Sequence, residues 1–149
     1  MATITKIKKN NDDLNMTIQN VDVSFVNAIR RLILSDVETV SFNTDEYLNS
    51  DLKIITNTTP LHNEFILHRF GLVPVNIGDI DSFDSSKYKF ILNKENKSNE
   101  IINVTTEDFE VYDTFTNEKL DTTDFFKKDS ITGEYILILK LKPNQVTGN

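Results

Sequence analysis

The sequence contains no cysteine, so it can form neither a disulfide framework nor a metal site with thiolate ligands. It has only four glycines, and none has the spacing of a phosphate-binding loop. No apolar run approaches the roughly 20 residues that a bilayer-spanning helix needs. The first residues lack the apolar stretch of a secretory signal peptide. These absences predict an intracellular protein with no membrane segment and no nucleotide-binding loop.

Positive charge is also scarce, because 16 Lys and Arg face 23 Asp and Glu, for a net charge of −7. Proteins that grip a phosphate backbone do so with clustered Lys and Arg. The only dense basic runs, residues 6–9 and 127–128, are each followed by acidic residues. We therefore expect no direct contact with nucleic acid. The 149 residues suit one domain or two small ones.

Apolar periodicity predicts a strand-rich chain with two helices. Residues 3–20 should form two strands separated by a polar turn at residues 10–13. A helix should begin at Ser24 and end near Ser35. The further strands that we expect lie at residues 37–42, 52–57, 88–93, 101–105, 109–113 and 135–141. The fold class is therefore α+β.

The first helix has one broad apolar face when residues are placed about 100° apart. This face consists of Phe25, Ala28, Ile29, Leu32 and Ile33. Such a stripe is most often the face with which an amphipathic helix packs onto a core. Taken alone, the pattern indicates packing and does not indicate a site.

The opposite face of the first helix is less ordinary. Leu34 lies there between Arg30 and Arg31, with Asn27 nearby. An isolated exposed leucine carries little information, and an arginine pair is often only a solvated surface. An apolar anchor flanked by arginines is nevertheless typical of the centre of a protein interface. Both interpretations, solvated face and docking patch, stay open at this point.

Start and stop signals predict the second helix. Thr59 can cap it, Pro60 suits the first helical position, and Gly71 suits a left-handed position just past the end. Pro74 follows, where it cannot interrupt the helix.

The second helix is apolar nearly all round. Leu61, Phe65 and Leu72 share one side. Three more large apolar residues spread over the rest of the surface: Ile66, Leu67 and Phe70. A short helix of this kind has to be covered on more than one face, either by its own domain or by a partner.

Two candidate metal sites fail on spacing. A zinc helix of the hydrolase type needs histidines at i and i+4, but His62 and His68 are six residues apart, roughly 120° around the helix. Glu64 would have to complete that site. The acidic stretch lacks the central glycine and terminal glutamate of a calcium loop; its members are Asp79, Asp81 and Asp84. We expect no catalytic residue and no metal, and a metal-dependent hydrolase is the enzymatic alternative.

Residues 20–37 are similar to the signature helix of the α-like RNA polymerase subunits, together with its lead-in. This family comprises the bacterial α N-terminal domain, the third-largest subunit of eukaryotic RNA polymerase II and the archaeal counterpart of that subunit. Residues 61–74 resemble the archaeal and eukaryotic form of a second helix, not the bacterial one. Residues 135–143, with Gln145, also look like the family pattern. The likeness therefore covers about residues 5–145.

The resemblance implies a partial α-like dimerisation domain at residues 1–40 and a mostly β insert domain at residues 41–145. It assigns the apolar face of the first helix to a dimer interface with a smaller α-like subunit: Phe25, Ala28, Ile29, Leu32 and Ile33. It assigns the opposite face to docking of the second-largest subunit: Asn27, Arg30, Arg31 and Leu34. The family-type residues of the second helix are Leu61, His62, Glu64, Phe65, His68, Arg69 and Gly71. Other small polymerase subunits are further expected partners.

The sequence departs from the family in two respects. It lacks the cysteines that hold zinc or an iron–sulfur cluster in some members, so we expect no cofactor. The C-terminal return of the dimerisation domain is absent, which leaves a fragment, a split gene product or part of a fusion as interpretations. Such a subunit would lie in the nucleus for a cellular eukaryotic polymerase, and in the cytoplasm or virion for an archaeal or viral one. The alternative is a free-standing β-rich protein-binding module outside transcription.

Overall fold

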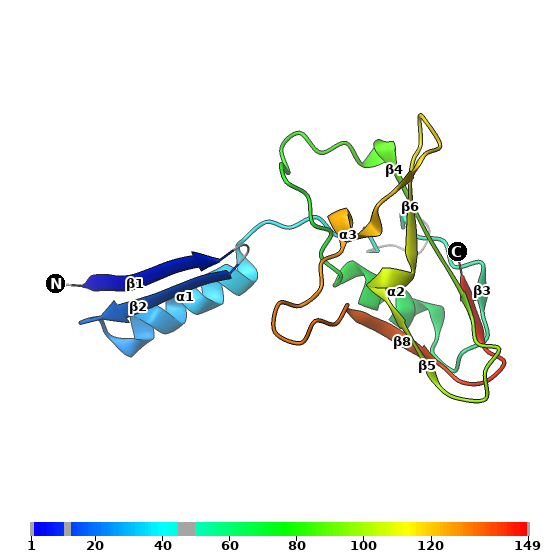
Figure 1. Ribbon diagram of the computed structural model, residues 1–149, viewed down its shortest axis with the longest axis horizontal. Helices are drawn as coiled ribbons and strands as arrows, with labels where there is room; N and C mark the ends of the chain where they lie inside the picture. Colours follow the sequence, from blue (N-terminus) through cyan, green and yellow to red (C-terminus); the bar gives the residue numbers. More distant parts are fainter. Residues whose placement is uncertain (1, 11–12, 45–49, 149) are drawn as a thin grey trace. The chain divides into compact units, whose positions relative to one another are not determined.

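A computed structural model describes residues 2–10, 13–44 and 50–148 of the chain. The chain divides into two compact units, Met1–Glu38 (unit 1) and Thr39–Asn149 (unit 2). The mixture of strands and helices confirms the α+β class (Figure 1). No helix in the described part of the chain combines the length and the apolar character that crossing a bilayer requires.

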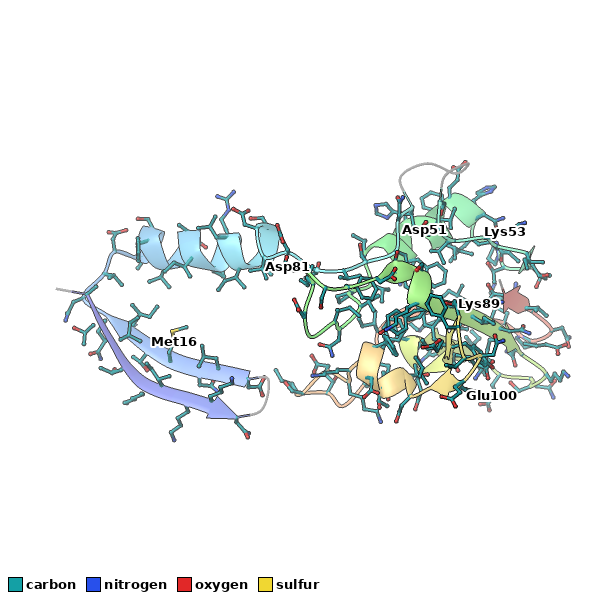
Figure 2. All side chains as sticks on the ribbon, turned by 90° about the horizontal axis from the view of Figure 1, so that it is seen from above. Met16, Asp51, Lys53, Asp81, Lys89 and Glu100 are labelled. Atoms are coloured by element: carbon teal, nitrogen blue, oxygen red, sulfur yellow. The ribbon has the colours of Figure 1, made fainter. Side chains whose placement is uncertain are left out.

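Unit 1 is a hairpin followed by a helix. Strands β1 (Thr3–Asn10) and β2 (Asp13–Gln19) pair antiparallel, as predicted, with an irregularity between Thr5 and Lys8. Asn11 and Asp12, in the predicted turn, lie outside the described residues. Helix α1 runs from Val23 to Ser35. Met16 points from the hairpin toward α1 (Figure 2) but remains 45% exposed. The described part of unit 1 contains no buried residue.

The described residues of unit 2 form two antiparallel sheets. The larger has the strand order β3-β9-β4-β6-β7, and the smaller pairs β5 with β8. The strands are β3 (Thr56–Asn57), β4 (Tyr88–Glu95), β5 (Ile102–Thr105), β6 (Phe109–Asp113), β7 (Lys119–Leu120), β8 (Leu137–Leu141) and β9 (Val146–Gly148). The helices are α2 (Asn63–Gly71) and α3 (Thr122–Phe125), with single 3-10 turns at Ser85–Lys87 and Thr106–Asp108.

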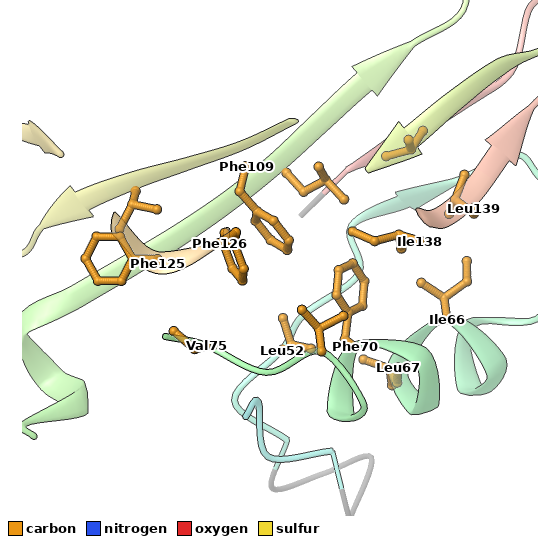
Figure 3. Close-up of a cluster of buried hydrophobic side chains, with 14 of the residues drawn as sticks. Leu52, Ile66, Leu67, Phe70, Val75, Phe109, Phe125, Phe126, Ile138 and Leu139 are labelled. Atoms are coloured by element: carbon orange, nitrogen blue, oxygen red, sulfur yellow. The ribbon is translucent and has the colours of Figure 1, made fainter. Parts of the chain in front are cut away.

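Aromatic rings fill the centre of unit 2. Phe109 is 2% exposed, and its ring centroid lies 4.9 Å from that of Phe126 and 5.8 Å from those of Phe42 and Phe70. Figure 3 shows Phe70 pointing from α2 toward the strands that carry this cluster. Each such side chain buries a large apolar area, and edge-to-face or offset contacts add to that burial. This core orients α2 in unit 2.

Three element predictions need correction. Residues 37–42 form no strand; only Val40 makes a bridge, with Val75. The strand expected at residues 52–57 is reduced to β3. The second helix begins at Asn63 and not at Pro60, because Thr59 caps a turn instead, its hydroxyl accepting a hydrogen bond from the Leu61 amide.

Two loops of unit 2 share one hydrogen-bonding pattern. In residues 113–118 the Asp113 carboxylate accepts from the amides two and three residues later, and Asn117 has φ 57°. In residues 129–134 Asp129 accepts in the same way, and Gly133 has φ 71°. In each loop a threonine hydroxyl accepts from the amide of a final glutamate. The two stretches, Asp-Thr-Phe-Thr-Asn-Glu and Asp-Ser-Ile-Thr-Gly-Glu, therefore encode the same turn.

Candidate partner-docking surfaces

Helix α1 begins one residue earlier than predicted. Asp22, not Ser24, is the N-cap, and its carboxylate accepts a hydrogen bond of 2.8 Å from the Ser24 amide. Hydrogen bonds from the Ser24 side chain and backbone lower the pKa of Asp22. The charged cap satisfies a backbone donor that the first turn leaves unpaired. This hydrogen bond therefore defines where α1 begins.

The apolar face of α1 is open. Phe25 is 58% exposed, Leu32 53% and Ile33 57%. Ala28 is also exposed, and only Ile29 is half-buried. A helix in a completed domain normally hides such a stripe. The residues predicted for the dimer interface therefore share one face that unit 1 does not cover.

The opposite face of α1 brings Asn27 and Arg30 together. The Asn27 Oδ1 atom accepts from Arg30 Nε at 3.1 Å and from Arg30 Nη2 at 3.0 Å. Leu34 is 76% exposed. The Arg31 guanidinium has no hydrogen-bond or ion-pair partner among the residues that the structure describes. One arginine of the pair is thus held in place, and the other is available to an external group.

Helix α2 has one covered side and one open side. Ile66, Leu67 and Phe70 are buried, with exposed fractions of 1–5%, whereas Phe65 is 62% and Leu72 is 70% exposed. Leu61, on the open side with them, is 38% exposed. Unit 2 itself therefore covers only half of this helix, and an apolar ridge remains (Leu61, Phe65 and Leu72).

The polar residues of α2 do different things. Arg69 donates from Nη2 to the backbone oxygen of Leu137 at 3.0 Å, which ties α2 to β8. His62, Glu64 and His68 are all exposed. No group of three or more His, Cys, Asp or Glu that could hold a metal occurs in the described part of the chain. Arg69 therefore has a structural contact, and the other three remain at the surface.

The prediction that Gly71 lies just past the end of the second helix, with a left-handed backbone, is wrong. It is the last residue of α2 and does not have the left-handed backbone that we predicted. A Cβ atom added to it would lie 2.6 Å from Oγ1 of Thr44. The lack of room for a side chain beside Thr44, and not a left-handed backbone, therefore explains why residue 71 is a glycine.

Sequence reasoning missed a cavity in unit 2. It measures about 580 Å³ and lies between residues 51–55 and the first half of β4. The bridge residues Val40 and Val75 are among its lining residues, with Phe42. Alternation of apolar residues did predict β4. It carries no information about which elements surround a cavity beside that strand.

Comparison with known proteins places these surfaces in a family. Residues 15–129 match the family described as the RNA polymerase Rpb3/Rpb11 dimerisation domain. The chain is 30% identical over 114 residues to a conjugation stage-specific protein of Tetrahymena thermophila, covering 68% of this chain and 34% of that protein. It is 29% identical to subunit 3 of DNA-directed RNA polymerases II, IV and V of Arabidopsis thaliana, covering 94% of this chain and 47% of the relative.

An archaeal relative shows the same similarity. The DNA-directed RNA polymerase subunit Rpo3 of Pyrococcus horikoshii is 28% identical over 99 residues, which is 64% of this chain and 36% of that protein. The chain thus spans between about a third and a half of the length of these three relatives. Because the matched residues 15–129 take in well over half of the chain, this protein belongs to the RNA polymerase Rpb3/Rpb11 dimerisation-domain family.

Proposed function

We propose that this protein is a non-catalytic assembly subunit of a DNA-dependent RNA polymerase. In this proposal, unit 1 is part of an α-like dimerisation domain and unit 2 is an insert domain. The apolar face of α1 pairs with a smaller α-like subunit, and the opposite face docks the second-largest subunit. Relatives that are named as polymerase subunits support this assignment. The subunit would act inside the cell, in the nucleus where the polymerase is eukaryotic.

The open apolar face of α1 supports the pairing step. Burying apolar surface contributes about 25 cal/mol per Å², and unit 1 leaves large side chains such as Phe25, Leu32 and Ile33 in water. Obligate interfaces resemble a domain core cut in half, with apolar residues at their centre. A face of this composition, in a unit whose described hairpin residues are likewise not buried, fits such an interface better than it fits a solvated surface.

The docking step is supported by one observation: an exposed Leu34 lies close to an arginine, Arg31, whose guanidinium is available to a partner. Leu34 is an apolar anchor that is 76% exposed. Asn27 holds Arg30 beside it, while the Arg31 guanidinium has no partner among the described residues. A planar guanidinium can form paired hydrogen bonds with a carboxylate of a partner. An arginine and a leucine at the centre of an interface each contribute about 2 kcal/mol or more when they are hot spots.

The test is co-purification with the second-largest subunit of the same polymerase. The double variant Arg31→Ala with Leu34→Asp should bind at least about 30-fold more weakly, since a loss of 2 kcal/mol corresponds to that factor. A matched control, Lys128→Ala with Ile131→Asp, makes the same kinds of change at exposed residues of unit 2. It should leave binding unchanged. Undiminished binding by the α1 variant would overturn the docking face.

A second outcome separates the polymerase from a free-standing module. A polymerase subunit purifies with very large partners, whereas an independent β-rich module purifies alone.

The variant Phe25→Asp tests the apolar face of α1. It should release the smaller α-like subunit, because it places a charge at the centre of an apolar interface. Retention of that subunit by the variant would refute the pairing face.

A further inference from the structure

Helix α1 ends in a serine that acidic residues follow. Ser35 is the last residue of the helix. Asp36 comes directly after it, and Glu38 lies three positions after it. Residues 35–38 are all exposed, and the chain leaves α1 as an irregular segment (Figure 1). Protein kinases select their substrates partly by the charges around the hydroxyl. A serine with acids one and three positions later suits an acid-directed kinase, which selects serines followed by acidic residues.

No other serine or threonine of the sequence has this pattern. Only Thr105 also has an acid three positions later, and the residue directly after it is Thr106, which is not acidic. Thr105 is half-buried, and its hydroxyl accepts a hydrogen bond from the Glu107 amide within a capping box. That hydroxyl has a structural use in unit 2. The acid-directed pattern therefore points to Ser35.

The hydroxyl of Ser35 lies beside the proposed docking face. Its Oγ atom donates to the backbone oxygen of Arg31 at 3.0 Å and to Oδ1 of Asp36 at 2.6 Å. Residues four apart on a helix are neighbours on its surface, so the side chains of Ser35 and Arg31 share one side of α1. A second-largest subunit that docks on Arg31 and Leu34 would therefore cover Ser35. A kinase has access to it in the free subunit, where the end of a helix opens at little cost in free energy.

A phosphate on Ser35 would change the partners of this side chain. The ester oxygen has no proton to donate, so both hydrogen bonds of the hydroxyl are lost. The negative charge of the phosphate repels the Asp36 carboxylate. The Arg31 guanidinium, one helical turn away, has no partner among the residues that the structure describes. It can form paired hydrogen bonds with the phosphate oxygens, and these would occupy the donors that docking uses.

We propose that Ser35 is the target of an acid-directed serine kinase, and that its phosphate captures Arg31 and blocks docking of the second-largest subunit. In the transfer, Ser35 Oγ forms a bond to the γ-phosphorus of ATP while the bond from that phosphorus to the ADP oxygen breaks. The hydroxyl proton leaves through the catalytic base of the kinase. The modified subunit stays out of the polymerase until a phosphatase hydrolyses the ester. This inference rests on the proposed function, because it concerns regulation of the same docking face.

The first experiment treats the whole protein with an acid-directed serine kinase and Mg-ATP and locates the phosphate by mass spectrometry. We expect one phosphate, on Ser35, and none in the variant Ser35→Ala. The phosphorylated protein should then bind the second-largest subunit at least about tenfold more weakly than the unmodified protein. Phosphatase treatment should restore binding. In an Arg31→Ala background, phosphorylation should weaken the remaining binding less than about threefold, because the residue that the phosphate captures is already absent.

A second experiment uses the free protein and does not depend on docking. Phosphorus NMR follows the titration of the phosphate on Ser35. The positive charge of Arg31 should lower the second pKa of the phosphate, so the variant Arg31→Ala should raise it. Arg30→Ala is the matched control, because Asn27 holds the Arg30 guanidinium. It should leave the titration unchanged.

The proposal is overturned if the phosphate goes to another residue, or if the phosphorylated protein binds the second-largest subunit as tightly as the unmodified one. It is also overturned if Arg31→Ala leaves the titration unchanged. Equal weakening with and without Arg31 would refute the capture, because the phosphate would then act by melting α1. If the unmodified protein does not bind the second-largest subunit, the proposed function fails and the block on docking fails with it. Mass spectrometry and phosphorus NMR would still decide whether Ser35 is modified and pairs with Arg31.

Discussion

Unit 1 should be stable only when a partner covers it, and hydrogen exchange can measure this residue by residue. The described part of unit 1 has no buried residue, while the described part of unit 2 has fifteen buried apolar ones. Helix α1 has 13 residues, a length at which an isolated helix is marginal in water. A lone two-stranded hairpin is marginal as well. Packing, which normally stabilises both kinds of element, is what unit 1 lacks.

These facts set the expected magnitudes. We expect an opening free energy of about 0–1 kcal/mol for α1, so its amides should exchange less than about tenfold more slowly than in an unfolded chain. Amides in the core strands of unit 2 should open only with global unfolding, at about 5 kcal/mol or more, and be protected by more than about 10³-fold. A ligand at about 100 times its Kd adds about 2.7 kcal/mol. The smaller α-like subunit at that concentration should therefore slow exchange in α1 by about a hundredfold.

The assay is exchange followed by NMR or mass spectrometry, with Ile29 in α1 and Leu139 in β8 as reporters. A chain shortened to residues 39–149 is the control, and its unit 2 amides should exchange as in the whole chain. Protection of α1 equal to that of β8 without a partner would refute the reasoning. In that case unit 1 would be a completed domain, and its apolar face would need another explanation.

Two other predictions concern the paired loops. Hydrogen bonds from the amides of Thr116 and Phe115 lower the pKa of Asp113, so its folded-state pKa lies below its unfolded value of about 3.9. Its contribution is present above that pH and is lost as pH falls through the folded pKa; Asp113→Asn should flatten the acid side of the stability curve measured by urea unfolding. Gly133→Ala should lower the free energy of unfolding by about 1–2 kcal/mol relative to Gly78→Ala, since neither added Cβ meets an atom within 4 Å and only Gly133 has a positive φ.

Apolar periodicity predicted burial better than it predicted hydrogen bonding. Strand β6 matches its expected bounds, and β4, β5 and β8 lie within two residues of theirs. Residues 37–42 also alternate, and Val40 and Phe42 do pack against the core. They nevertheless form only one bridge, because alternation reports which side chains are inside and not whether a second strand lies alongside. Strands β7 and β9, of two and three residues, are too short to show any period.

The start signals of the second helix were assigned to the wrong structure, because the same residue types stabilise both turns and helix starts. Thr59 and Pro60 suit a helix start, but Asn57 Oδ1 accepts from the Thr59 amide at 2.9 Å and the Thr59 hydroxyl accepts from Leu61. These bonds make turns, and α2 starts later with no side-chain cap. Ser, Thr, Asn and Asp stabilise both turns and helix starts. The sequence alone therefore could not place this boundary, although it did separate Leu61, Phe65 and Leu72 from the apolar residues that α2 buries.

Gly71 allows the two explanations for a glycine to be separated by experiment. The sequence suggested a left-handed backbone after the helix, whereas the structure shows a helical residue whose added Cβ would approach Thr44 Oγ1 to 2.6 Å. Overpacking of this kind costs about 1–3 kcal/mol, so Gly71→Ala should lower the free energy of unfolding by that amount. Thr44→Ala removes the opposing atom, so Gly71→Ala introduced into that variant should cost little, or should stabilise, since alanine favours a helix over glycine by about 1 kcal/mol. An unchanged cost in the Thr44→Ala background, measured by a double-mutant cycle in urea, would show that backbone conformation and not space selects glycine at the end of α2.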